Sequence, residues 1–89
     1  MHSIATKRFW RCFEALPPDI QRKAESAFLL WSADRSHRSL EFKQVHPTRP
    51  IFSARIGLYW RALGLREDDM IVWFWIGSHA EYDKLLTRL

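Results

Sequence analysis

The sequence predicts an α+β fold in which an N-terminal helical hairpin packs on a four-stranded antiparallel sheet and a short helix ends the chain. Apolar residues recur at helical spacing through the first 33 residues, and they alternate with polar residues in short runs between residues 40 and 76. Near the end, Ser78 opens a helix-capping motif. Because 89 residues have room for one core, we expect a single domain over residues 1–89.

The composition is that of a globular protein. Hydrophobic residues make up 47% of the chain and aromatic residues 15%, which excludes a disordered tail. The longest apolar run, Met70–Ile76, is far shorter than the roughly 20 residues that cross a bilayer, and no signal-peptide pattern is seen. We therefore expect a cytoplasmic protein that contacts no membrane. Cys12 is the only cysteine and the histidines lack metal-ligand spacing, so we expect no disulfide, metal or other cofactor.

Two amphipathic helices are predicted first. Residues Ile4–Leu16 place apolar side chains on one face and charged ones elsewhere. Pro17 and Pro18 then break the chain, and a second helix follows over Asp19–Ala33 because proline is tolerated in a first helical turn. The short connection predicts a helical hairpin.

Four strands are predicted after a polar loop at residues 34–39. Three are assigned from alternation and from the turn formers between them, and the last is apolar throughout, as expected of an interior strand. Within that last strand, Trp73 and Trp75 are expected to share one face and to belong to the core. The predicted strands are Leu40–Val45, Ile51–Ile56, Tyr59–Leu65 and Met70–Ile76.

The turn after the second strand decides which side chains share a face. A two-residue turn would pair Arg55 with Trp60, whereas a three-residue turn over residues 57–59 pairs Arg55 with Arg61. We predict the three-residue turn. It leaves Ser53 and the two arginines together on the face away from the helices.

Ser78 and Glu81 match the S-x-x-E capping box, which predicts a final helix that runs to Leu89. His79 would lie in its first turn, where free N–H groups and the helix dipole favour a phosphate. The alternative for His79 is a set of local hydrogen bonds at the helix start.

Positive charge is concentrated in the predicted sheet. Seven basic residues and a single acid, Glu41, lie between Arg35 and Arg66. Arginine supplies ten of the 14 basic residues of the chain, and its planar fork suits phosphates. We expect a nucleic acid or an acidic protein as partner, with Lys43 and Arg49 as candidates to extend the surface that binds it. The alternative for Lys43 is an exposed strand lysine without a role in binding.

The segments LEFKQV, YWRALG and WFWIGSHAEYDKLL resemble RelE/ParE toxins of bacterial type II toxin–antitoxin modules, and the similarity spans nearly the whole chain. The resemblance implies a small, basic, metal-free toxin whose partner is a cognate antitoxin. RelE-like members cut mRNA in the ribosomal A site, whereas ParE-like members inhibit DNA gyrase. The first strand usual in the superfamily is not expected here, because the chain enters its first helix almost at once.

The resemblance also implies a candidate catalytic site. Arg55 and Arg61 lie where RelE-like nucleases place basic residues that stabilise the phosphate. His79 lies where those nucleases carry an arginine or a catalytic histidine, and Tyr82 is the expected substitute for their C-terminal tyrosine. Ser53 departs from the pattern, because its position is basic in the nucleases. The alternative for the arginines is a solvated basic face that only binds an acidic antitoxin.

The leading functional hypothesis is a metal-independent RNA endonuclease that acts on ribosome-bound mRNA and uses the ribose 2′-OH as nucleophile. Such a reaction needs proton transfer and cations for the developing charge. One alternative is a ParE-like binder that inhibits gyrase. Another is a toxin-fold protein that has lost activity and only binds an antitoxin. All three share one scaffold and differ in a few surface side chains.

Overall fold

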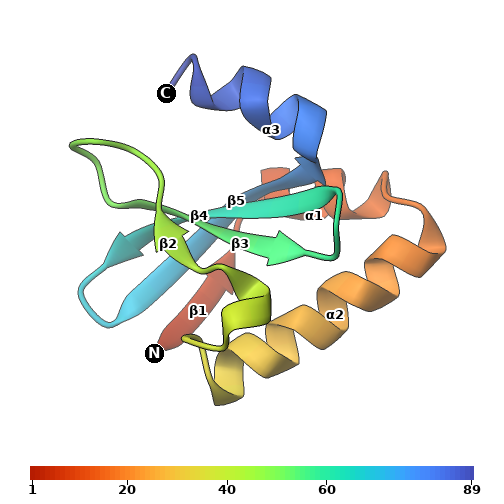
Figure 1. The fold of residues 1–89 in the computed structure, drawn as a ribbon, viewed down its shortest axis with the longest axis horizontal. Coiled ribbons are helices and arrows are strands. Elements are labelled where there is room, and N and C mark those ends of the chain that lie inside the picture. The colour runs from red at the N-terminus through yellow and green to blue at the C-terminus, as the bar shows by residue number, and fades with distance from the viewer.

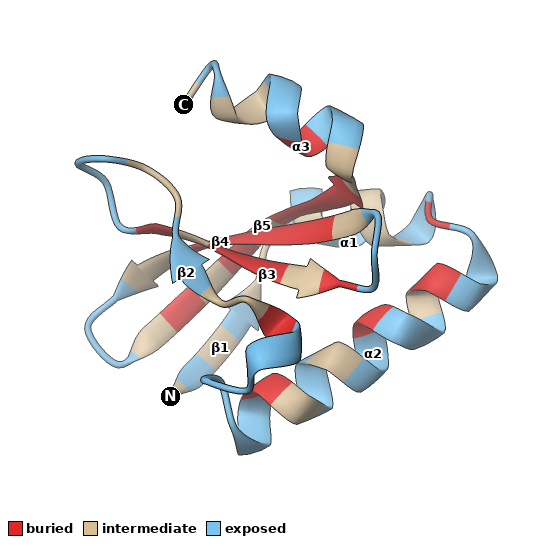
Figure 2. Cartoon of the chain, in the orientation of Figure 1, coloured by how far each residue is buried: buried red, intermediate tan, exposed pale blue.

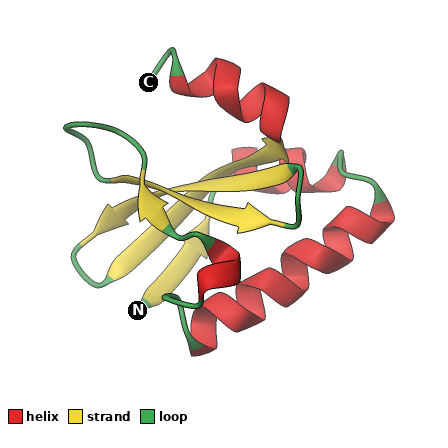
Figure 3. Ribbon diagram, viewed as in Figure 1, coloured by secondary structure: helices red, strands yellow, loops and turns green.

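The computed structural model describes all residues from 1 to 89 and contains three α-helices, one 3₁₀-helix (η1) and a five-stranded sheet (Figure 1, Figure 3). In chain order the elements are β1 (His2–Ala5), α1 (Lys7–Glu14), α2 (Pro18–Ala33), η1 (Arg38–Leu40), β2 (Lys43–Gln44), β3 (Ile51–Ile56), β4 (Trp60–Glu67), β5 (Met70–Ser78) and α3 (His79–Leu86). The strand order is β1-β5-β4-β3-β2. β1 runs parallel to β5, and the other neighbours are antiparallel.

The predicted α+β class is confirmed, but the expectation that the first strand is absent is wrong, because β1 adds a fifth strand to the sheet. β1 pairs with the start of β5, and just beyond it the Thr6 N–H donates to the Trp73 carbonyl at 2.9 Å. Helix α1 therefore starts at Lys7 rather than at Ile4, and Thr6 caps it by accepting from the Phe9 N–H. Four residues are too few to show a pattern, and their partner strand lies near the other end of the chain.

Helices α1 and α2 cover one face of the sheet, and α3 covers part of the other (Figure 1). Helix α1 packs on β5 and α2 packs on β3, so the two helices of the predicted hairpin lie over different strands of the sheet. No helix has both the length and the apolar character needed to span a membrane. The larger core lies between α1, α2 and the sheet, and its buried residues are Leu16, Ile20, Ala24, Trp31, Leu40, Ala54, Ile56, Ala62, Ile71, Trp73 and Ile76.

A second, smaller core lies on the opposite face, between the sheet and α3. Ile51 and Leu63 come from the inner strands, Trp75 from β5 and Tyr82 from α3, and all four are buried. Figure 2 shows buried segments along β3, β4 and β5 and a single buried position on α3. The face that was predicted to be polar is therefore partly apolar, and its apolar part anchors α3.

Trp73 and Trp75 lie in different cores, so the prediction that they share a face is wrong. The register of β4 and β5 shifts between Leu63, which pairs with Trp75, and Gly64, which pairs with Trp73. Phe74 is the extra residue in this β-bulge, and an extra residue reverses the alternation of a strand. Both tryptophans are buried, as predicted.

The predicted strand Leu40–Val45 is reduced to the two residues of β2. Leu40 instead ends η1 and is buried in the larger core. Glu41 follows with a left-handed backbone, at a φ of 43°, and Phe42 packs against the same core. Leu40 and Phe42 thus alternate with polar residues because both contact the core from either side of a turn, and not because they lie in one strand.

Candidate functional site

Arg55 and Arg61 lie opposite each other on β3 and β4, which confirms the predicted turn over residues 57–59. Gly57 has a φ of 67°, a conformation that glycine adopts without a steric penalty. Leu63 lies two residues beyond Arg61 on β4 and belongs to the core beneath α3. Both arginines therefore start from the sheet face that α3 partly covers.

Arg61 is buried, with only 7% of its surface exposed. Its Nη1 donates to Ser53 Oγ at 3.3 Å, and its Nη2 donates to Glu41 Oε1 at 3.1 Å. A buried guanidinium needs such partners because an uncompensated buried charge is strongly destabilising. Ser53 is fully buried and supplies an acceptor for Arg61.

Arg55 is more exposed and contacts the same acid. Its Nη1 lies 3.7 Å from Glu41 Oε2, and its Nε donates to the Gly57 carbonyl at 3.1 Å. Glu41 thus bridges the two arginines, with one carboxylate oxygen toward each. Glu41 was not predicted to belong to the site. The available signal was that it is the only acid between Arg35 and Arg66.

Helix α3 presents His79 in its first turn, as predicted. Ser78 forms the expected capping box: its Oγ accepts from the Glu81 N–H at 3.2 Å, and the Glu81 carboxylate accepts from the Ser78 N–H at 3.4 Å. The His79 side chain is half-exposed, and its Nδ1 lies 3.2 Å from Asp83 Oδ2, one turn later. The cap fixes the helix start and so fixes the position of His79.

Tyr82 connects the histidine to the arginines. Its ring centroid lies 5.6 Å from Arg61 Cζ and 5.4 Å from the centroid of the His79 ring. Tyr82 is buried, whereas His79 is open to solvent. The four residues predicted to be catalytic, Arg55, Arg61, His79 and Tyr82, are therefore joined by consecutive contacts that also include Glu41.

This arrangement provides groups that bind anions and a group that exchanges protons. Guanidiniums offer paired donors to phosphate oxygens, and an accessible imidazole can give or take a proton. No group of three or more His, Cys, Asp or Glu side chains is arranged to hold a metal ion.

Lys43 and Arg49, which were predicted to extend the binding surface, are both exposed. Lys43 pairs with Ser53 across β2 and β3, so it borders the face that carries the arginines. Arg49 lies in the loop between those strands, where its N–H donates to His46 Nδ1 at 2.9 Å. His46 Nε2 in turn lies 2.9 Å from the Leu89 carbonyl. Arg49 therefore belongs to a loop that contacts the C-terminus.

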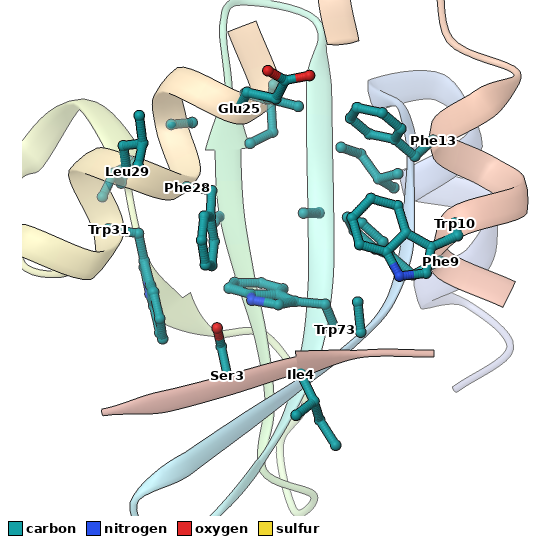
Figure 4. Close-up of a pocket in the computed structure, with 18 residues that line it drawn as sticks. Ser3, Ile4, Phe9, Trp10, Phe13, Glu25, Phe28, Leu29, Trp31 and Trp73 are labelled. Atoms are coloured by element: carbon teal, nitrogen blue, oxygen red, sulfur yellow. The ribbon is translucent and has the colours of Figure 1, made fainter. Parts of the chain in front are cut away.

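An apolar groove opens on the other face of the sheet, between α1, α2 and β1 (Figure 4). Its volume is about 710 Å³, and 16 of its 18 lining residues are hydrophobic. Among them, Trp10, Phe28 and Leu29 remain exposed. The indole N–H groups of Trp31 and Trp73, which also line the groove, are buried without a hydrogen-bond partner. The groove was not predicted, because helical periodicity does not report the spacing between two helices.

Residues 18–84 match the ParE-like toxin domain family, and this range includes every residue of the candidate site. The chain belongs to the ParE-like toxin domain family. The predicted resemblance to RelE/ParE toxins is therefore confirmed. No curated protein matches the sequence.

Solved structures similar to this ParE-like chain show the RelE fold. The RelB–RelE antitoxin–toxin complex from Methanococcus jannaschii gives a TM-score of 0.74 at 13% identity, over 92% of this chain and 96% of that one. YafQ from E. coli gives 0.72 at 9% identity, over 90% and 94%. The toxin–antitoxin complex RelBE2 from Mycobacterium tuberculosis gives 0.60 at 23% identity, over 86% and 95%. At these identities the likeness establishes the fold alone.

Proposed function

We propose that this ParE-like protein is the toxin of a toxin–antitoxin module and that it cuts ribosome-bound mRNA in the cytoplasm without a metal ion. The observation that carries the proposal is the set of contacts that joins Arg55 and Arg61 to Tyr82 and His79. RNA cleavage by the ribose 2′-OH needs cations at the phosphate and a group that transfers protons. The side chains on this face meet both needs.

In the proposed reaction the 2′-OH attacks the adjacent phosphorus. A bond forms from O2′ to phosphorus and the bond from phosphorus to O5′ of the next nucleotide breaks. The 2′-OH loses its proton, and the leaving O5′ gains one. His79 transfers a proton in this reaction through Nε2, because its Nδ1 is in contact with Asp83. Arg55 and Arg61 stabilise the negative charge that grows on the phosphate oxygens.

Tyr82 has a supporting part in this proposal. Its ring packs against both Arg61 and His79, and it is buried in the core beneath α3. A buried ring restricts the positions of the two groups that contact it. Tyr82 therefore assists by positioning the cation relative to the imidazole.

The proposed protein partner is an antitoxin. The similar chains from M. jannaschii and M. tuberculosis were solved as antitoxin–toxin complexes. On this chain, an acidic segment laid over Lys43 and the two arginines would block access of mRNA. The apolar groove between α1 and α2 is a second exposed surface of the kind that binds proteins.

A ParE-like inhibitor of gyrase is the second candidate, and one observation favours it. Arg61 is buried, and both of its terminal nitrogens are already bonded, to Ser53 and to Glu41. A protein that only binds a partner does not need a free guanidinium. On that reading the two arginines stabilise the sheet and shape its surface.

One pair of assays separates these functions. Purified protein is added to ribosomes stalled on a defined mRNA, and the cut ends are mapped by primer extension; in parallel, DNA supercoiling by gyrase is measured. The proposal expects cleavage at the A-site codon and normal supercoiling. Inhibition of gyrase without cleavage would establish the second candidate. No effect in either assay would mark a toxin-fold protein that only binds an antitoxin.

A further inference from the structure

The carboxylate of Glu41 sits between the two guanidiniums of the site. One oxygen lies 3.1 Å from Arg61 Nη2, and the other lies 3.7 Å from Arg55 Nη1. A phosphate that binds both arginines would present two oxygens to the same nitrogens, because a guanidinium donates to phosphate oxygens as it donates to carboxylate oxygens. The protein thus places its own anion where an RNA phosphate would bind.

The backbone holds Glu41 in this position. Its φ of 43° is in the left-handed region, which is unfavourable for a residue other than glycine. The residues on either side are anchored: Leu40 is 2% exposed, and the ring of Phe42 lies 5.7 Å from that of Trp31 and 5.1 Å from that of Phe52. Such strain persists only where the surrounding structure fixes it. The contact is therefore set by the fold and does not come from a loose loop.

The three charged groups differ in their access to water. About a third of the side chain is exposed in both Glu41 (36%) and Arg55 (32%), whereas only 9% of the Arg61 side chain is exposed. The carboxylate can therefore rotate into solvent, where it is well hydrated, while Arg61 stays in place. An arriving phosphate would then replace the lost charge, so that the buried guanidinium is not left unpaired.

We propose that Glu41 is the resident anion of the Arg55 and Arg61 site and that an RNA phosphate binds by displacing its carboxylate. This inference rests on the proposed function, since it assigns an RNA phosphate to that site. Because every anion must first displace this carboxylate, Glu41 weakens the binding of all anions at the site. Glu41 thereby keeps the arginines ordered and prevents them from binding isolated phosphates. A phosphate of an RNA that is already held by other contacts displaces the Glu41 carboxylate.

The test compares Glu41→Gln with wild type. The glutamine has the same shape and keeps an acceptor for Arg61, but it removes the negative charge. Glu67→Gln is the matched control, because it removes the same charge from an exposed position on β4. It lies six residues from Arg61, a separation of about 20 Å along a strand. The probe is a short single-stranded RNA with 2′-O-methyl riboses, which cannot be cleaved, and binding is followed by fluorescence anisotropy.

The expected result is that Glu41→Gln binds the probe about tenfold more tightly than wild type, since one like charge near the phosphate is removed. Glu67→Gln should match wild type within about twofold, because its charge is farther than a Debye length from the site. Equal or weaker binding by Glu41→Gln would overturn the proposal. If that variant does not fold, Glu41→Asp provides the test: its shorter side chain withdraws the carboxylate, and the proposal again expects tighter binding than wild type.

The outcomes also separate this inference from the proposed nuclease function. Cleavage of mRNA by wild type, together with unchanged probe binding by Glu41→Gln, would refute the inference alone. Tighter binding by Glu41→Gln, in a protein that cuts no mRNA, would refute the nuclease function but support displacement of the Glu41 carboxylate by an RNA phosphate.

Discussion

The guanidinium of Arg61 lies over the ring of Tyr82, with 5.6 Å between Cζ and the ring centroid. This contact joins β4 to α3 and so ties the strand that carries an arginine to the helix that carries His79. A cation above an aromatic face is stabilised by the ring quadrupole. The distance between the cation and the imidazole therefore depends on a buried ring.

Substitutions of Tyr82 test whether the ring or its hydroxyl matters. We expect Tyr82→Phe to keep both cleavage and stability, because the ring contacts remain. Tyr82→Ala should lower the free energy of unfolding by about 3–5 kcal/mol, as for other buried aromatic residues. Thermal unfolding and cleavage of mRNA on ribosomes are the measurements. Loss of cleavage in a fully stable Tyr82→Phe would show that the hydroxyl takes part in the chemistry.

The two arginines should separate activity from stability. Arg61→Ala removes the donor to the buried Ser53 hydroxyl, so we expect a loss of about 1–3 kcal/mol in the free energy of unfolding. Arg55→Ala affects a partly exposed ion pair and should cost less than about 1 kcal/mol. Both should lower the cleavage rate by about a hundredfold.

Urea denaturation and single-turnover cleavage measure the two effects of these arginine substitutions. Arg88→Ala, at an exposed position near the C-terminus, is the control and should change neither quantity. Full cleavage activity in Arg55→Ala would show that this guanidinium does not contact the reacting phosphate.

His79 should be required for the reaction but not for the fold. Its side chain is half-exposed, so His79→Ala should change the free energy of unfolding by no more than about 0.5 kcal/mol. Loss of a proton-transfer group should slow cleavage by about 10²- to 10⁴-fold. Asp83→Asn should have a smaller effect, because it weakens only the contact that orients the ring. His2→Ala, at an exposed position on β1, is the control, and equal cleavage by it and His79→Ala would contradict the assignment.

Gly64 should be intolerant of a side chain. A Cβ at this position would lie 2.6 Å from Ile71 Cγ1 and 2.9 Å from Trp73 Cε3, closer than such atoms pack. We expect Gly64→Ala to lower the free energy of unfolding by about 1–3 kcal/mol through overpacking, measured by urea denaturation. Unchanged stability would mean that the bulge can open to admit a methyl group.

The parts of the fold that could be predicted depend on local chemistry. Strand β3 has its predicted limits, Ile51–Ile56, because its alternation is complete and turn formers bound it. The three-residue turn that begins at Gly57 correctly predicted that Arg55 pairs with Arg61. The Ser78 capping box likewise predicted the start of α3. Each of these features is decided by residues close together in the chain.

The parts that were missed depend on residues far apart in the chain. β1 has four residues and gains its stability from β5, which starts at Met70. The bulge at Phe74 places Trp73 and Trp75 in cores on opposite faces of the sheet, which the alternation of a single strand does not indicate. Glu41 reaches the arginines only because η1 ends in a left-handed turn. The basic residues of the site were thus predictable, whereas the acid that bridges them was not.

We propose that the face carrying Arg61 and His79 performs RNA cleavage by a 2′-OH nucleophile. The most direct measurement is single-turnover cleavage of two ribosome-bound mRNAs that differ only in the ribose or 2′-deoxyribose at the nucleotide before the cut. We expect the ribose form to be cut, leaving a 2′,3′-cyclic phosphate, and the deoxyribose form to stay intact. Equal cleavage of both mRNAs, or cleavage of neither, would contradict it.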